Sequence, residues 1–88
     1  MENSQENDPI INALVEALNV DAEEIRPEHK IKADLGMESI DILDIRFRIE
    51  RSVGIKITRD EKQVLLDQPD LTVAGLRKFI DEKKSRTE

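Results

Sequence analysis

Apolar residues recur at helical spacing in four segments of this chain, and residues that start or end helices stand between the segments. The first segment follows Asp8-Pro9, where the aspartate can accept hydrogen bonds from free amides and proline suits the first helical position. The second segment begins near Ser39 and runs to Val53, and Gly54 suits the left-handed position after a helix. The apolar stripe of the first segment consists of Ile10, Ile11, Leu14, Val15 and Leu18.

The remaining segments predict one short helix and one longer helix. Thr58 or Asp60 can cap the short helix, which ends before Gln68-Pro69 because the residue preceding a proline is disfavoured in the helical region. Thr72 can cap the last helix, and Lys83-Lys84 near its end suit the helix dipole. The sequence therefore predicts an all-α fold, a bundle of three longer helices and one short helix without a strand. The apolar face of the last helix consists of Val73, Leu76, Phe79 and Ile80.

Residues 19–32 interrupt the helical pattern between the first two helices. A connection of about fifteen residues is long for a compact domain, so it is expected to be functional or to be packed by its own side chains. Ile25 and Ile31 are the expected anchors of this loop in the core.

The length of 88 residues is enough for one domain. We expect a folded domain at residues 8–84 between tails at residues 1–7 and 85–88. The chain has no cysteine, which excludes disulfides, thiolate zinc sites and a cysteine nucleophile. Its first residues are polar and acidic, and no apolar run is long enough to cross a bilayer, so we expect a cytoplasmic protein without membrane insertion.

Charge is unevenly distributed along the chain, whose net charge is -6. Residues 1–45 carry 12 acidic and 3 basic side chains (-9), and residues 46–88 carry 8 acidic and 11 basic side chains (+3). An acidic domain without tryptophan or tyrosine lacks the basic field and the stacking surfaces that nucleic-acid binding requires. We therefore expect no nucleic-acid partner.

The predicted second helix carries apolar residues on two opposite sides. At about 100° per residue, Ile40, Leu43 and Phe47 lie within roughly 60° of one another. Because charged residues border this strip, we expect it to be exposed for a partner, although burial of the helix on both sides is the alternative. The charged border consists of Asp41, Asp44, Arg48 and Arg51. The opposite stripe, assigned to the core, consists of Ile42, Ile45, Ile49 and Val53, with Arg46 at its margin.

Ser39, at the start of this helix, has no recognisable catalytic partner. The single histidine, His29, lies in another segment, where we interpret it as a solvated loop residue rather than a base or metal ligand, and G-M-E-S-I lacks the second glycine of a nucleophile elbow. Two interpretations of Ser39 remain. It is either a helix cap, which would stabilise the helix by about 1 kcal/mol. Or it is the acceptor of a phosphate-containing modification, which the positive end of the helix dipole would favour.

Residues 34–45, D-L-G-M-E-S-I-D-I-L-D-I, resemble the signature of the acyl carrier protein family, whose serine receives 4'-phosphopantetheine from coenzyme A. The resemblance continues through S-V-G-I-K-I-T-R-D-E (residues 52–61) and D-L-T-V-A-G-L-R-K-F-I (residues 70–80), so it covers nearly the whole chain. It implies a non-catalytic carrier that holds acyl groups as thioesters on the attached arm.

The resemblance also implies roles for individual residues. Ser39 would be the attachment point, and Asp34, Leu35 and Gly36 would shape the approach to it. The catalytic base and the magnesium would then belong to the phosphopantetheinyl transferase. An acyl ligase, ketosynthase or acyltransferase would be a further partner, and the carrier itself is expected to be a monomer. The expected partner-facing residues are Glu38, Ile40, Asp41, Leu43, Asp44, Phe47, Arg48 and Arg51.

The chain departs from the family pattern around the serine and on the second helix. Glu38 stands where aspartate is usual, and Ile40 stands where leucine is usual. Arg48 and Arg51 would repel the basic patch of general partner enzymes, which suggests a specialised fatty-acid, lipid or polyketide pathway. Alternatively, the arginines form ion pairs within the helix, as Arg48 would with Asp44. Such a pair stabilises a helix by only a few tenths of a kcal/mol.

Two other functions are compatible with these residues. The runner-up is an aminoacyl or peptidyl carrier, which differs in the acid that a ligase loads. An unmodified helical interaction module using the exposed strip is the other, and it would never acquire the arm.

Overall fold

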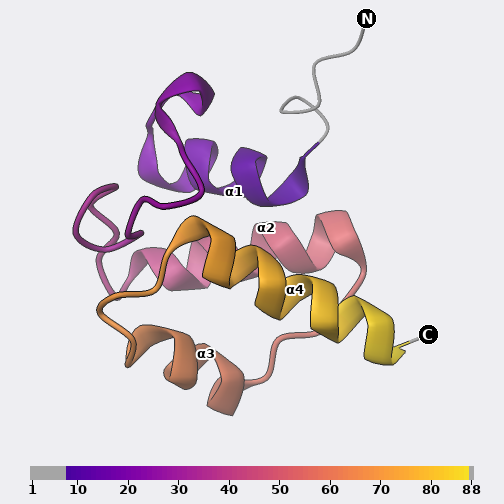
Figure 1. Cartoon of the computed structure of the whole chain (residues 1–88). Helices are drawn as coiled ribbons and strands as arrows, with labels where there is room; N and C mark the ends of the chain where they lie inside the picture. Colours follow the sequence, from indigo (N-terminus) through magenta and orange to yellow (C-terminus); the bar gives the residue numbers. More distant parts are fainter. Residues whose placement is uncertain (1–7, 88) are drawn as a thin grey trace, which may run out of the picture.

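The computed structural model describes the backbone of residues 8–87 and the side chains of residues 8–85, which form a helical bundle (Figure 1). α1 and α3 both contact α2, and α4 completes the bundle. Within the described residues there is no strand, and only one isolated antiparallel bridge joins Lys30 to Thr72. The predicted all-α fold is confirmed. The elements are α1 (Pro9–Leu18), the 3₁₀ helix η1 (Ala22–Glu24), α2 (Asp41–Val53), α3 (Arg59–Leu66) and α4 (Val73–Thr87).

Local signals in the sequence place most helix ends. Asp8 Oδ1 accepts hydrogen bonds from the amides of Ile10 at 3.0 Å and Ile11 at 3.3 Å, which fixes the start of α1. Gly54 follows α2 with φ 85°, a left-handed conformation that glycine adopts without strain. η1 was not predicted. α4 continues to Thr87 and therefore includes residues 85–87, which the sequence analysis assigned to a tail.

The core contains the apolar faces that the helical spacing predicted. Ile42, Ile45 and Ile49 of α2 are buried, and Val53 packs against them in a partly buried position. The loop before α2 is anchored by buried Ile25 and Ile31, as expected. Backbone hydrogen bonds then join this loop to the start of α4, from Ile31 N to Leu71 O at 2.9 Å, from Val73 N to His29 O at 3.0 Å and from Ala74 N to Pro27 O at 2.9 Å.

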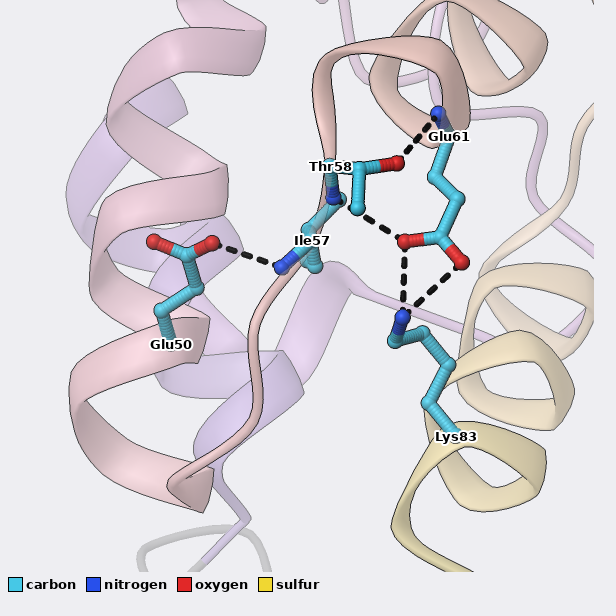
Figure 2. Close-up of polar contacts among 5 residues, drawn as sticks. All are labelled: Glu50, Ile57, Thr58, Glu61 and Lys83. Atoms are coloured by element: carbon cyan, nitrogen blue, oxygen red, sulfur yellow. Dashed lines mark hydrogen bonds and ion pairs between the residues drawn. The ribbon is translucent and has the colours of Figure 1, made fainter. Parts of the chain in front are cut away.

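A capping box at Thr58 positions α3 (Figure 2). The Thr58 hydroxyl accepts from the Glu61 amide at 3.1 Å, and Glu61 Oε1 accepts from the Thr58 amide at 3.0 Å. Lys83 of α4 donates to both oxygens of Glu61, at 2.7 and 2.8 Å. On the other side, Glu50 of α2 accepts from the Ile57 amide at 2.7 Å. Thr58, rather than Asp60, is therefore the cap of α3.

The Glu61–Lys83 pair makes stability depend on pH. Hydrogen bonding to Lys83, followed by that to the Thr58 amide, lowers the pKa of the partly buried Glu61 carboxyl from its ordinary value. A lowered folded-state pKa stabilises the fold above the ordinary glutamate pKa of about 4.3, and this contribution is lost as the pH falls through the folded-state value.

We expect Lys83→Met to lower the free energy of unfolding by about 1 kcal/mol at neutral pH, because it removes the cation bound to Glu61. The difference from the wild type should shrink as the pH falls from about 4.3 through the lowered folded-state pKa of Glu61, because the carboxyl then becomes protonated in both proteins. Urea unfolding at neutral pH and at a pH below the folded-state pKa of Glu61 measures this difference in stability. Lys78→Met, at an exposed position of α4, is the control. A deficit of the same size at both pH values would contradict this role of Glu61.

Candidate functional site

A tight turn leads the chain from the loop into α2. The Gly36 amide donates to Lys32 O and the Met37 amide donates to Ile31 O, both at 3.1 Å. Gly36 has φ 79°, which side chains disfavour, and the Met37 side chain is buried in the core. Since Ile31 is itself buried, the turn is held to the core at both ends.

Asp34, Leu35 and Gly36, the residues expected to shape the approach to the serine, form this turn. The Asp34 carboxylate accepts a hydrogen bond from the Lys30 amide at 2.8 Å and is exposed. Leu35 is partly buried against the core. These residues fix the turn that presents the next segment of the chain.

Ser39 is exposed two residues before the first residue of α2. Among the described residues its hydroxyl has no hydrogen-bond partner, and the cap position belongs to Ile40, whose side chain makes no capping bond. The interpretation of Ser39 as a helix cap is therefore wrong. The hydroxyl is exposed and unpaired within the part of the chain that the structure describes.

The backbone around Ser39 is held by its neighbours. Asp41 Oδ2 accepts from the Glu38 amide at 2.9 Å, while the Asp41 amide donates to Glu38 O at 2.9 Å. The Ile42 amide donates to Ser39 O at 3.4 Å, but the amides of Ser39 and Ile40 find no acceptor within the described part of the chain. The hydroxyl thus lies beside two unused donors at the positive end of α2.

His29 makes its side-chain hydrogen bond within its own loop. Its Nδ1 accepts a hydrogen bond from the Arg26 amide at 3.2 Å within the loop, and its side chain is partly buried rather than fully solvated. Residues 8–87 contain no group of three or more histidine or acidic side chains that could hold a metal ion. What the site offers is an accessible hydroxyl on a fixed backbone.

The exposed strip of α2 continues from this serine. Ile40, Leu43 and Phe47 are 70%, 49% and 55% exposed, so the prediction that this side of α2 faces solvent is confirmed. Glu38 at the near end and Asp44 at the border are also exposed, whereas Asp41 is partly buried.

The two arginines of the border differ in their surroundings. Arg48 Nε donates to Asp44 Oδ1 at 2.9 Å, as the sequence suggested, and Arg48 also forms an ion pair with Glu16 of α1. Arg51 lies over the Phe47 ring, 5.5 Å from its centroid. The sequence analysis missed Glu16, and only its place on the polar side of α1 could have suggested the contact.

Comparison with known proteins identifies the family. Residues 8–67 match the family described as "Phosphopantetheine attachment site". The chain belongs to the acyl carrier protein family. The acyl carrier protein of Wolinella succinogenes is 31% identical over 77 residues, which cover 88% of this chain and 95% of that protein. The acyl carrier protein of Helicobacter pylori is 28% identical over 71 residues, covering 81% of this chain and 85% of its own length.

A third relative matches over a shorter stretch. The acyl carrier protein AcpXL of Rhizobium meliloti is 39% identical over 54 residues, which cover 61% of this chain and 57% of AcpXL. The chain thus aligns with less than two thirds of AcpXL but with nearly all of the Wolinella protein.

Membership of the acyl carrier protein family defines the broad role of the chain. Acyl carrier proteins are non-catalytic, and their attachment domain holds 4'-phosphopantetheine. They interact with a phosphopantetheinyl transferase and with enzymes that handle acyl groups. None of the described helices combines the length and apolar composition needed to cross a bilayer.

Proposed function

We propose that Ser39 carries the 4'-phosphopantetheine arm and that the chain delivers acyl groups, as thioesters on this arm, to enzymes of a specialised fatty-acid, lipid or polyketide pathway. The observation that supports this most directly is the free, exposed hydroxyl of Ser39 immediately before α2 in a member of this family.

The surroundings of Ser39 suit a phosphodiester. The unused amides of Ser39 and Ile40 and the positive end of α2 favour a negative group, typically by about 0.3 to 1 kcal/mol. The turn at Asp34, Leu35 and Gly36 holds the approach to the serine without covering it. The chain has no cysteine, so the arm would supply the only thiol.

A loading experiment tests the acyl-carrier role. The apo-protein is incubated with an acyl-coenzyme A, magnesium and a broad-specificity transferase, and its intact mass is measured before and after hydroxylamine treatment. We expect the mass to rise by the acyl-phosphopantetheine group and then to fall by the acyl group, because hydroxylamine cleaves thioesters. An unchanged mass would favour an unmodified interaction module.

The exposed strip, Ile40, Leu43 and Phe47, supports a docking role for α2, and its charged border supports a choice among partners. Arg48 is already neutralised by Asp44 and Glu16, so Arg51 is the more available cation. A partner of matching charge would present an acidic side chain opposite Arg51. A general fatty-acid enzyme with a basic patch would be repelled there.

We expect Arg51→Glu to raise the rate at which a general fatty-acid ligase or ketosynthase uses this carrier, by about tenfold, because one repulsive contact becomes attractive. Arg48→Glu is a poorer test because it would place a third carboxylate beside Asp44 and Glu16. Arg59→Glu, at the exposed first residue of α3, is the matched control. Equal rates for the wild type and Arg51→Glu would rule out partner selection by this arginine.

The proposal includes a monomeric protein that works in the cytoplasm. An aminoacyl carrier would have the same arm and differ in the acid that its ligase loads. The relatives reported above are named acyl carrier proteins, which favours acyl cargo.

A further inference from the structure

A shallow hollow of about 760 Å³ follows the solvent-facing side of α4, the helix drawn in orange to yellow in Figure 1. Pro27, in the loop before α2, forms one wall, and every other described lining residue belongs to α4. No residue of α2, which is described in full, lines the hollow, so the hollow is separate from the exposed strip. We call its α4 residues the α4 face, which consists of Ala74, Arg77, Lys78, Asp81, Glu82 and Ser85.

The α4 face has a symmetric arrangement of side chains along the helix. A small residue stands at each end, and two cations followed by two carboxylates stand between them. Positions at equal distance from the midpoint between residues 79 and 80 therefore carry opposite charges. A second α4 packed in the reverse direction would place cations level with carboxylates and small residues level with small residues. One line along the helix, within about 60° at 100° per residue, contains Ala74, Lys78, Asp81 and Ser85.

Three of the four charged side chains of the α4 face have no ion-pair partner within the described residues. Arg77 is the exception, because its Nη2 lies 2.6 Å from Asp8 Oδ2. None of the ion pairs among residues 8–85 includes Lys78, Asp81 or Glu82. Lys78 and Glu82 stand four residues apart, a spacing at which a helix can pair them, yet they do not pair here. These exposed charges are therefore available to another molecule.

A second copy of this chain matches the α4 face only in the reverse direction. Parallel packing about a two-fold axis would place Lys78 beside Lys78 and Asp81 beside Asp81, and like charges repel. Antiparallel packing instead places Lys78 of each copy against Asp81 and Glu82 of the other. The two-fold axis makes each of these contacts occur twice. Because Ala74 and Ser85 are small, their meeting leaves room for the two helices to approach.

We propose that two copies of this chain associate through the α4 face as an antiparallel pair, with Lys78 of each copy facing Asp81 and Glu82 of the other. A typical stable interface has about 20 to 30 residues on each side, whereas seven described residues line this hollow. The association is therefore weak, and the monomer remains the main form at low protein concentration. Since α2 takes no part, each copy keeps its own Ser39 and exposed strip available, and the inference does not depend on the arm.

Sedimentation equilibrium of the full chain measures this association. Protein concentrations up to about 1 mM are needed, because a weak pair has a dissociation constant on the order of 1 mM. Salt at about 0.15 M screens the repulsion between two copies of net charge -6 beyond about 8 Å. We expect the average mass of the wild type to rise with concentration above that of one copy. The mass of one copy at every concentration would overturn the inference.

Lys78→Glu and Glu82→Lys are each expected to lower the association constant by about tenfold, because each places like charges opposite one another. An equimolar mixture of the two variants should associate as the wild type does, since the introduced glutamate of one then faces the introduced lysine of the other. Net charge alone predicts a different result, because Glu82→Lys changes it from -6 to -4, which would strengthen association.

Arg59→Glu is the matched control for these variants, because it lies outside the α4 face and changes the net charge as Lys78→Glu does. It should leave the association constant close to that of the wild type. Single variants that associate as strongly as the wild type, or a mixture that associates no better than either variant alone, would overturn the inference.

Cross-linking tests the direction of packing separately. The chain has no cysteine, so Ala74→Cys and Ser85→Cys each carry one thiol. Oxidation of an equimolar mixture should link mainly one variant to the other, and intact mass distinguishes this product from the two like-with-like products. Products in statistical proportions would overturn antiparallel pairing. If a charge variant fails to fold, this result decides alone. Neither failure would affect the proposed function, which the loading experiment tests.

Discussion

Ser39→Ala is expected to abolish addition of the phosphopantetheine arm completely while leaving the fold unchanged. The substitution removes the proposed attachment oxygen, and the alanine side chain has no hydroxyl that could form the phosphodiester. Since the Ser39 side chain is exposed and makes no hydrogen bond within the described residues, its loss should change the free energy of unfolding by no more than about 0.5 kcal/mol.

Intact mass after incubation with coenzyme A and a transferase measures the first effect, and thermal unfolding measures the second. Ser52→Ala is the matched control, because Ser52 is another exposed serine, within α2, and this variant should still accept the arm on Ser39. Modification of Ser39→Ala to the wild-type extent would refute the assignment. Unfolding of this variant would show that Ser39 has a structural role instead.

Leu14→Ala is expected to cause the largest loss of stability among the substitutions considered. The Leu14 side chain is 0% exposed, on α1 in the core. Truncating a fully buried leucine costs about 2 to 5 kcal/mol, a large share of the roughly 5 to 15 kcal/mol that stabilises a typical domain. Urea unfolding followed by circular dichroism measures the difference.

The matched control is Leu43→Ala on α2. Leu43 is 49% exposed, so the same truncation should cost about 1 kcal/mol or less. Similar losses for the two variants would show that the exposed strip is part of the stabilising core, and the proposal that it serves for docking would fail.

The helices could be predicted because their ends depend on nearby residues. Asp8 and Thr58 cap helices through amides within three residues, and Gly54 ends α2 through its own backbone conformation. The two sides of α2 were assigned correctly because four charged residues border the strip that contains Phe47, whereas Arg46 alone lies at the margin of the core stripe. The side of α2 that faces the core could therefore be predicted from the charges and the apolar spacing within that one helix.

Features that depend on distant contacts were not predictable in the same way. The free hydroxyl of Ser39 follows from a backbone in which Ile40, rather than the serine, occupies the cap position. The buried Nε of Arg46 depends on where α3 lies, and the sequence gives only the position of Arg46 at the margin of the core stripe. The pairing of Arg48 with Glu16 likewise depends on the packing of α1 against α2.

The most direct test of the central claim is one mass measurement, with fragmentation, on protein isolated from its native cell. The account predicts a mass above that of the unmodified chain by one phosphopantetheine group, with or without an acyl group, and fragments that place it on Ser39. Protein of unmodified mass from cells with an active transferase, or an arm on any other residue, would contradict it.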